Sequence, residues 1–164
     1  MISVFFHDET TRKQEGAGRA STDGPSDDDD IFRQVALSAS HNNLIGDPLT
    51  SADGVNGNIK GTLGANILVG GYTEFDVNQI ALTKLLSEWS RTDLNYAARV
   101  DHLRAADLGG NNGAYSLDGT TVHDNSALDQ PFGGPHDDWY LAHAGGGIVD
   151  SITGKVASEE LDII

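Results

Sequence analysis

The spacing of glycines constrains this chain more than any other feature. The stretch G-T-L-G-A-N-I-L-V-G-G at 61–71 is dense in glycine, yet Leu68 lies nine residues after Ile59. A second stretch at 129–140, D-Q-P-F-G-G-P-H-D-D-W-Y, places Asp129 and Asp138 nine residues apart. A nine-residue period of paired glycines, an acidic residue and an apolar residue predicts short parallel strands joined by tight turns, as in a β-roll.

The period changes after residue 75, where the pattern becomes helical. In D-V-N-Q-I-A-L-T-K-L-L-S-E-W-S, one face carries Val77, Ala81, Leu85 and Trp89. This spacing predicts an amphipathic helix, with Asp76 as its N-cap. A second, shorter helix is predicted at 93–104, with its inward residues being Leu94, Ala97, Ala98 and Leu103.

Strand patterns return after these helices. Asp118-Gly119 stands between two alternating runs in A-Y-S-L-D-G-T-T-V-H, which predicts a β-hairpin. The fold class expected from the whole chain is therefore mainly β with a helical insert. We expect parallel β-roll or β-solenoid turns around a two-helix insertion and a β-hairpin.

Composition divides the chain into two regions. Residues 1–40 form an acidic, polar N-terminal arm that contains four consecutive aspartates at 27–30. A segment this polar buries too little apolar surface to order itself, and we interpret the aspartates as a solvated charge run. Residues 41–164 form the predicted module, with the helical insert at 76–104.

Charge and composition exclude several classes of partner. The chain has 25 acidic and 10 basic residues, a formal net charge of −15 at pH 7. Such a charge repels nucleic-acid phosphates, whereas bound divalent cations would relieve the self-repulsion. Cysteine is absent, which excludes disulfides and thiolate metal ligands. No run of about 18 apolar residues occurs, so no membrane span is expected.

These motifs resemble the RTX, or haemolysin-type, calcium-binding family, and in particular the C-terminal module of large secreted or surface bacterial proteins. The family repeat is G-G-x-G-x-D-x-U-x, where U is apolar. In the second stretch, the first, second, sixth and eighth positions are Gly133, Gly134, Asp138 and Tyr140. In the first stretch Asn66 stands at the sixth position, where the family has aspartate, which makes the second stretch the better candidate site.

The resemblance implies a calcium site between stacked turns. Turns nine residues apart would place Asp129 above Asp138, and main-chain carbonyls near Gly133, Gly134 and His136 would complete about six oxygen ligands. Asp124 and Asn66 are further candidates. The alternative is that these side chains only cap tight turns by accepting main-chain N–H groups.

Other chemistries have weaker support in the sequence. Six histidines invite a zinc interpretation, but no H-E-x-x-H or similar pairing occurs. No nucleophile elbow, phosphate-binding loop or dinucleotide fingerprint is present, so we expect no enzyme. A hydrolase that uses the adjacent Asp137 and Asp138 is disfavoured, since neighbouring residues of a strand point to opposite faces.

The expected function is that of a non-enzymatic, calcium-binding structural module of an exported bacterial protein. The family resemblance implies type I secretion to the cell surface or medium, and the ending Asp162-Ile163-Ile164 is similar to some signals of that route. The alternative is a structural or interaction subunit that docks on a larger assembly, with a protein partner bound through the N-terminal arm.

Overall fold

The computed structural model describes residues 44–46, 58–61 and 63–164, with side chains described from Ile59 onward. The predicted N-terminal arm at 1–40 lies outside the described residues.

The largest sheet is parallel and has four strands in the order β1-β3-β7-β8. The strands are β1 (Leu44–Gly46), β3 (Ile67–Val69), β7 (Trp139–Ala142) and β8 (Glu160–Ile163). In register, Ile67 lies opposite Trp139, and Trp139 lies opposite Glu160. Strands β3 and β7 are apolar and buried throughout, as expected for strands that are covered on both faces.

Two smaller sheets accompany it. β2 (Asn58–Lys60) pairs in parallel with β6 (Gln130–Phe132), and residues 151–153 extend along β6 through Ser151 N–H and Thr153 N–H bonds to Asp129 and Pro131. β4 (Tyr72–Thr73) pairs antiparallel with β5 (Val122–His123).

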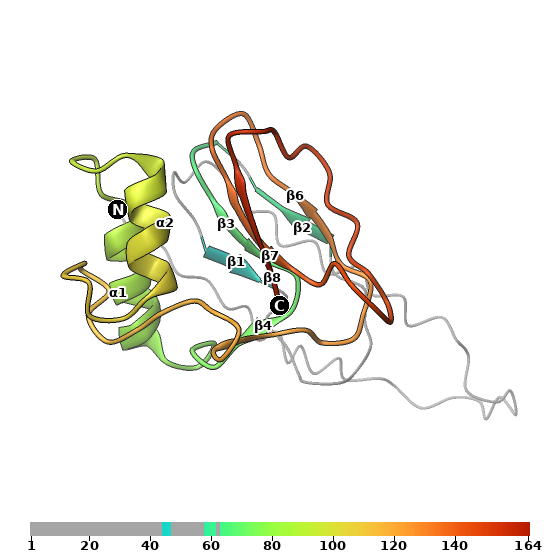
Figure 1. Ribbon diagram of the computed structural model, residues 1–164, viewed down its shortest axis with the longest axis horizontal. Helices are drawn as coiled ribbons and strands as arrows, with labels where there is room; N and C mark the ends of the chain where they lie inside the picture. The colour runs from blue at the N-terminus through green and yellow to red at the C-terminus, as the bar shows by residue number, and fades with distance from the viewer. Residues whose placement is uncertain (1–43, 47–57, 62) are drawn as a thin grey trace, which may run out of the picture.

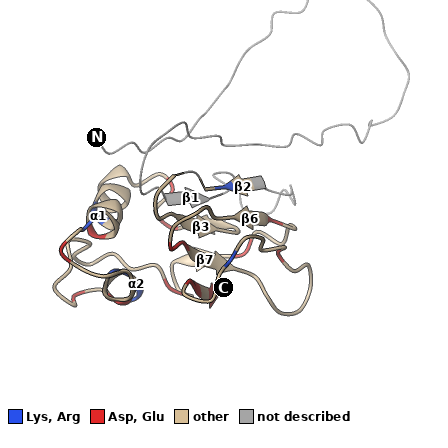
Figure 2. Cartoon of the chain, turned by 90° about the horizontal axis from the view of Figure 1, so that it is seen from above, with Lys and Arg blue, Asp and Glu red and all other residues tan. Residues whose placement is uncertain are grey.

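The two predicted helices are present and lie together on one side of the strands (Figures 1 and 2). They are α1 (Gln79–Trp89) and α2 (Tyr96–Arg104). Helix α1 begins later than predicted, because the side chain of Asn78, not Asp76, accepts the Ala81 N–H. Val77 therefore precedes the helix and is almost fully exposed, contrary to its predicted place in the core.

The second helix also differs from its prediction. It begins at Tyr96 rather than residue 93, and its buried residues are Val100 and Leu103. Leu94 and Ala98 are only half-buried, and Ala97 is exposed.

The strands separate two apolar cores because alternate residues of a strand face opposite sides. The core on the helical side is the larger one, and its members include Ile67, Val69, Leu85, Trp89, Val100, Leu103, Trp139 and Leu141. Between the strands lies a smaller core of Ile59, Leu68 and Tyr140. Ile59 and Leu68, nine residues apart, thus pack together, and the predicted helix face of Ala81, Leu85 and Trp89 is confirmed as buried.

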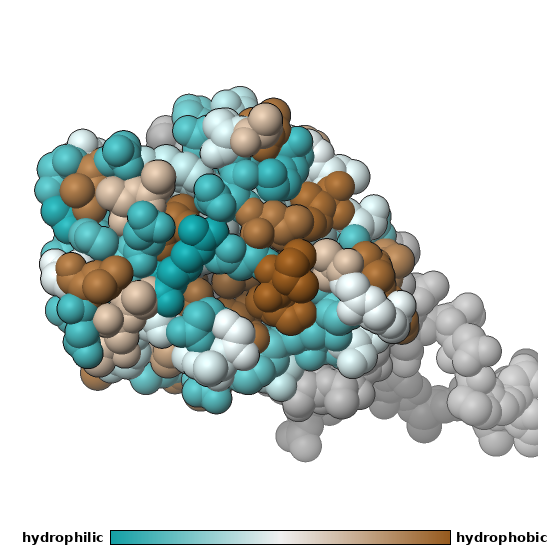
Figure 3. Space-filling model, in the orientation of Figure 1, coloured by the Kyte–Doolittle hydropathy of each residue, from teal (hydrophilic) through white to brown (hydrophobic). Residues whose placement is uncertain are grey.

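Large apolar side chains also remain on the surface, among them Ile80 and Ile163, and Figure 3 shows brown groups scattered within a largely hydrophilic face.

The predicted β-roll or β-solenoid is wrong. In the described residues the strands form three separate small sheets, one of them antiparallel, and no solenoid is seen. The nine-residue step holds only locally. Residues that meet between β3 and β7 are 72 apart in sequence, and those between β7 and β8 are 21 apart. A short periodic stretch therefore produced parallel pairing without a regular coil.

The predicted β-hairpin at Asp118-Gly119 is also wrong. The Asp118 carboxylate accepts hydrogen bonds from Ser116 and Thr120, and its main-chain carbonyl accepts the Thr121 and Val122 N–H groups. These bonds close a compact turn, and the strand that follows it pairs with β4 instead of with residues 114–117. Side-chain hydrogen bonds of Asp, Ser and Thr here replaced a hairpin ladder.

Candidate metal site

Three turns precede the strands β3, β7 and β8, and each ends with a buried polar residue. These residues are Asn66, Asp138 and Glu159, which we call the Asp138 row. Because Ile67, Trp139 and Glu160 are in register, the residues just before them also come into line across the sheet. The fold thus gathers a neutral amide and two acids at one end of the strands.

Each acid of the Asp138 row accepts hydrogen bonds from the residue before it in the row. Asp138 Oδ1 accepts the main-chain N–H of Asn66 at 2.7 Å and its side-chain Nδ2 at 2.8 Å. Glu159 Oε1 accepts the Asp138 N–H at 3.1 Å, and its Oε2 accepts the Val156 N–H at 2.6 Å. The row therefore ties the three turns together by charge-assisted hydrogen bonds.

One carboxylate oxygen remains outside this pattern. Asp138 Oδ2 and the hydroxyl of Tyr140 are both buried, and neither makes a hydrogen bond of normal geometry. The main-chain N–H groups of Gly134 and Gly133 lie near the two side chains and oppose the rise of their pKa values. Both pack closely against Gly133, since a Cβ at that glycine would overlap them. A buried polar atom without a partner costs free energy, so two of them in one place indicate a site for a further group.

The electrostatics of this site disfavour an uncompensated charge. Burial is the main cause that raises the pKa of Asp138, and the nearby charge of Glu159 raises it further, against the hydrogen bonds from Asn66. Burial also raises the pKa of the Tyr140 phenol, with Glu159 and Asp138 adding to the rise. A proton or a cation would stabilise this group of oxygens.

Some of the predicted ligands come together here. Asn66, Gly133 and Asp138 share the site, and Gly134 lies beside it, close enough to affect the pKa of Asp138. His136 is exposed, and its Nδ1 accepts the Gly64 N–H at 3.3 Å. Its side chain thus contacts the neighbouring turn.

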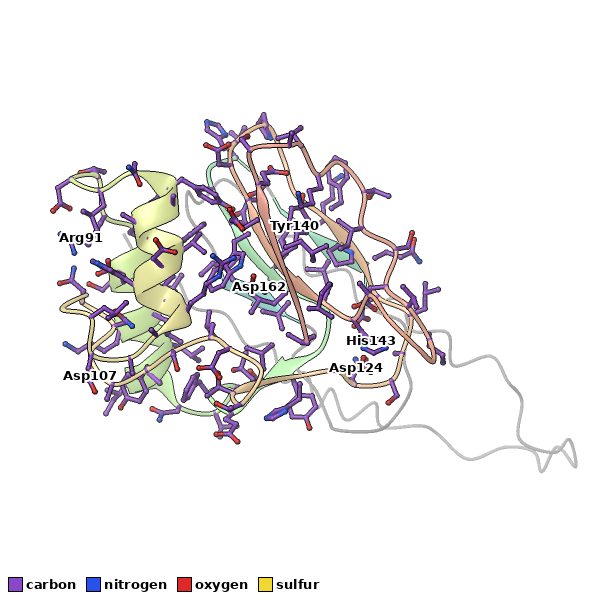
Figure 4. All side chains as sticks on the ribbon, in the orientation of Figure 1. Arg91, Asp107, Asp124, Tyr140, His143 and Asp162 are labelled. Carbon is purple, nitrogen blue, oxygen red and sulfur yellow. The ribbon has the colours of Figure 1, made fainter. Side chains whose placement is uncertain are left out.

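The other two predicted ligands lie elsewhere. Asp129 precedes β6, so Asp129 and Asp138 begin strands of different sheets and do not stack as their nine-residue spacing implied. Asp129 N–H donates to Asp150 Oδ1 at 2.9 Å. Asp124 lies beside His143, with Oδ2 and Nδ1 3.9 Å apart (Figure 4). A metal role for either aspartate stays a prediction.

The sequence analysis missed Glu159 and the hydroxyl of Tyr140, which belong to the Asp138 site, and Asp150, which pairs with Asp129. A 21-residue repeat in the sequence could have identified the two acids, Glu159 and Asp150. D-S-I-T-G at 150–154 repeats the pattern of D-Q-P-F-G at 129–133, and Glu159 follows Asp138 by the same 21 residues. The Tyr140 hydroxyl had no signal of its own, because its ring also satisfies the apolar position of the pattern.

The donor set fits a hard cation only in part. Among the described residues, no group of three or more His, Cys, Asp or Glu side chains could hold a metal ion. Calcium takes six to eight oxygens, which include main-chain carbonyls and water as well as carboxylates. Asp138 Oδ2 supplies a buried carboxylate oxygen suited to it, and Gly133 lies directly against that oxygen.

Comparisons with known proteins add no assignment, since no family model, curated protein or solved structure matches this chain. Neither helix in the described part of the chain is long and apolar enough to cross a membrane.

Proposed function

We propose that this chain is a non-enzymatic structural module that binds calcium at Asp138. The observation that carries the proposal is the buried Asp138 Oδ2, which has no hydrogen-bond partner and lies beside the equally unpartnered Tyr140 hydroxyl. Ordinary folding would leave such an oxygen exposed or bonded. A bound cation compensates both its charge and its burial.

Individual residues would have distinct roles in this site. Asp138 Oδ2 is the charged ligand, the Tyr140 oxygen is a neutral one, and main-chain carbonyls of the turn around Gly133 and Gly134 supply others. Asn66 fixes the carboxylate through two hydrogen bonds to Oδ1, which leaves Oδ2 for the ion. Such supporting contacts orient ligands and tune their affinity.

The ion would act on stability rather than on chemistry. It would fasten the turn at 133–138 between those at 63–66 and 154–159, and it would offset part of the −15 charge. With few charged ligands the affinity is expected near about 10⁻⁴–10⁻³ M, which is typical of extracellular modules. A site of this affinity would fill outside the cell, which fits the export that the resemblance to secreted RTX proteins implies.

Thermal unfolding with and without calcium tests the proposal. At calcium about tenfold above a Kd near 10⁻³ M, we expect a stabilisation of about 1.4 kcal/mol and a higher Tm. Asp138→Asn should lose this increment, whereas Asp137→Asn, at an exposed neighbour, should keep it. Equal melting curves of the unsubstituted chain in EDTA and in calcium would refute the proposal.

A further inference from the structure

A side chain of helix α2, Tyr96, bridges the main chains at the start of β7 and β8. Between β3 and β7, the Trp139 N–H donates directly to the Asn66 carbonyl at 2.8 Å. At the corresponding place between β7 and β8, the hydroxyl of Tyr96 lies between the two main-chain groups. It donates to the Asp138 carbonyl at 2.7 Å and accepts the Glu160 N–H at 2.8 Å.

Tyr96 is well held in this position. It is the first residue of α2, directly after the N-cap Asn95, and its ring packs edge-on against Trp89 with centroids 5.8 Å apart. Burial raises the pKa of its phenol, so the hydroxyl keeps the proton that it donates to Asp138. The helix therefore presents a fixed donor and acceptor to the edge of the sheet.

This bridge lies next to the Asp138 row. Glu159 immediately precedes the residue whose N–H bonds to Tyr96, and its Oε1 accepts the Asp138 N–H. We propose that Tyr96 is the positioning residue of the Asp138 site, because its hydroxyl sets the spacing of the 154–159 turn against Asp138. The link to calcium rests on the proposed function, whereas the placement of the turn does not.

A second contact between α2 and β8 provides a control. Arg104, at the end of the same helix, bonds Asp162 at 2.6 and 2.7 Å and Glu160 at 3.0 Å. Trp139 Nε1 also donates to Asp162, at 3.1 Å. Helix α2 thus holds β8 at two places, of which only Tyr96 contacts the main chain of Asp138.

The experiment compares Tyr96→Phe with Arg104→Gln. Phe keeps the ring contact with Trp89 and removes only the hydroxyl. Amide hydrogen exchange read residue by residue should show the Asp138 and Glu160 amides at least about tenfold less protected in Tyr96→Phe. Arg104→Gln should leave the Asp138 amide within about twofold of the unsubstituted chain. Calcium affinity, measured by calorimetry with calcium chloride, should fall about tenfold in Tyr96→Phe and change less than about twofold in Arg104→Gln.

The outcomes separate the two proposals. If the unsubstituted chain binds no calcium, the proposed function fails, and loss of Asp138 amide protection in Tyr96→Phe still supports the positioning role. Unchanged protection of both amides in Tyr96→Phe overturns that role whatever calcium does. Equal losses at Asp138 in Tyr96→Phe and Arg104→Gln also overturn it, because Tyr96 would then be one structural contact among several.

Discussion

The Asp138 row and the pair of Asp129 with Asp150, which we call the Asp129 row, are built by the same rule. In each, an acid just before a strand donates its main-chain N–H to the carboxylate of a residue 21 positions later. The later acid of each pair accepts an N–H at both carboxylate oxygens, and Glu159 does so from Asp138 and Val156. Asp150 accepts an N–H at each oxygen, from Asp129 at 2.9 Å and from His143 at 2.8 Å. Asp138 uses only Oδ1.

This difference distinguishes a structural cap from a candidate ligand. Aspartate before a strand ordinarily satisfies main-chain N–H groups, and Asp150 does so with both of its oxygens. At Asp138 the same arrangement leaves one oxygen, together with the Tyr140 hydroxyl, unpartnered. The presence of an acid at the right spacing therefore does not identify a site, and the unused buried oxygen of Asp138 is what makes it a candidate ligand.

The largest expected effect comes from adding a methyl group beside that oxygen. In Gly133→Ala the new methyl group overlaps Asp138 Oδ2 and the Tyr140 hydroxyl, so the turn must shift. We expect a loss of about 2–3 kcal/mol in the free energy of unfolding measured in urea. Gly145→Ala is the matched control, since nothing lies within 4 Å of its added Cβ, and its stability should change by less than about 0.5 kcal/mol. Equal stabilities of the two variants would show that Gly133 is not tightly packed against Asp138 and Tyr140.

The two rows should respond differently to removal of a charge in calcium-free buffer. In Asp150→Asn, the amide NH2 must face either the Asp129 N–H or the His143 N–H, so one hydrogen bond is lost in either orientation. The expected cost is about 1–3 kcal/mol. In Asp138→Asn, the amide keeps its oxygen toward Asn66 and turns its NH2 toward the Tyr140 hydroxyl, so the expected cost is below about 1 kcal/mol.

Urea denaturation of both variants in EDTA measures this contrast. An Asp138→Asn variant that is destabilised as much as Asp150→Asn would mean that the carboxylate has a second acceptor role, and the distinction between the rows would then be lost.

The sequence predicts the local features of this chain and misses their assembly. Apolar spacing identified the buried face of α1, and the glycine pattern identified the turn around Gly133 and Asp138. Both signals lie within about ten residues. The meeting of Asn66 with Asp138 spans 72 residues and depends on where the helical insert returns the chain to the sheet, which no local period encodes. The predicted β-roll or β-solenoid was wrong for this reason.

The sequence predicted about half of the residues that form the candidate site. Asp138, Gly133 and Asn66 followed from the repeat, but Glu159 belongs to a 21-residue spacing that occurs once more, between Asp129 and Asp150. Tyr96 has no sequence signal, because an aromatic residue in the first turn of a helix is ordinarily a packing residue. Its hydroxyl matters only because the sheet edge happens to lie within hydrogen-bond distance.

A smaller effect is expected from pH in calcium-free buffer. Burial raises the pKa of Asp138, so the folded state holds this proton more tightly than the unfolded state. Its contribution therefore increases stability as the pH falls through the folded pKa toward the ordinary value of 3.8, and is lost as the pH rises through the folded pKa. Below about pH 4 the trend should reverse, because Glu88 and Asp118, whose pKa values are lowered in the fold, take up protons.

Asp138→Asn isolates this contribution, because it keeps the remaining acidic groups and removes one titration. Its stability should rise less than that of the unsubstituted chain as the pH is lowered from neutrality toward about 4. Parallel pH profiles of the two proteins would place the proton elsewhere, with Asp150, whose pKa burial also raises, as the first alternative.

The smallest expected effect concerns His143, which supports only the Asp129 row. Its ring nitrogens face the main-chain oxygens of Gly146 and Ile164, at 2.5 and 3.1 Å. Oxygens of this kind only accept, so both bonds form only when the imidazole is protonated at both nitrogens. These contacts, first of all with Gly146, raise the pKa of His143 above its ordinary 6.5, with smaller contributions from Asp124 and Asp150.

The stabilisation by His143 is present below about pH 6.5 and is lost as the pH rises through the folded pKa. Because its main-chain N–H also holds Asp150 Oδ2, the loss should weaken the Asp129 amide more than the Asp138 amide. Residue-resolved hydrogen exchange at about pH 6 and about pH 8, corrected for the intrinsic rate, measures this difference. His143→Gln should abolish it, since glutamine does not titrate. A titration midpoint of His143 at or below 6.5 would contradict the doubly donating imidazole, and equal responses of the two amides would show that the rows are coupled rather than separate.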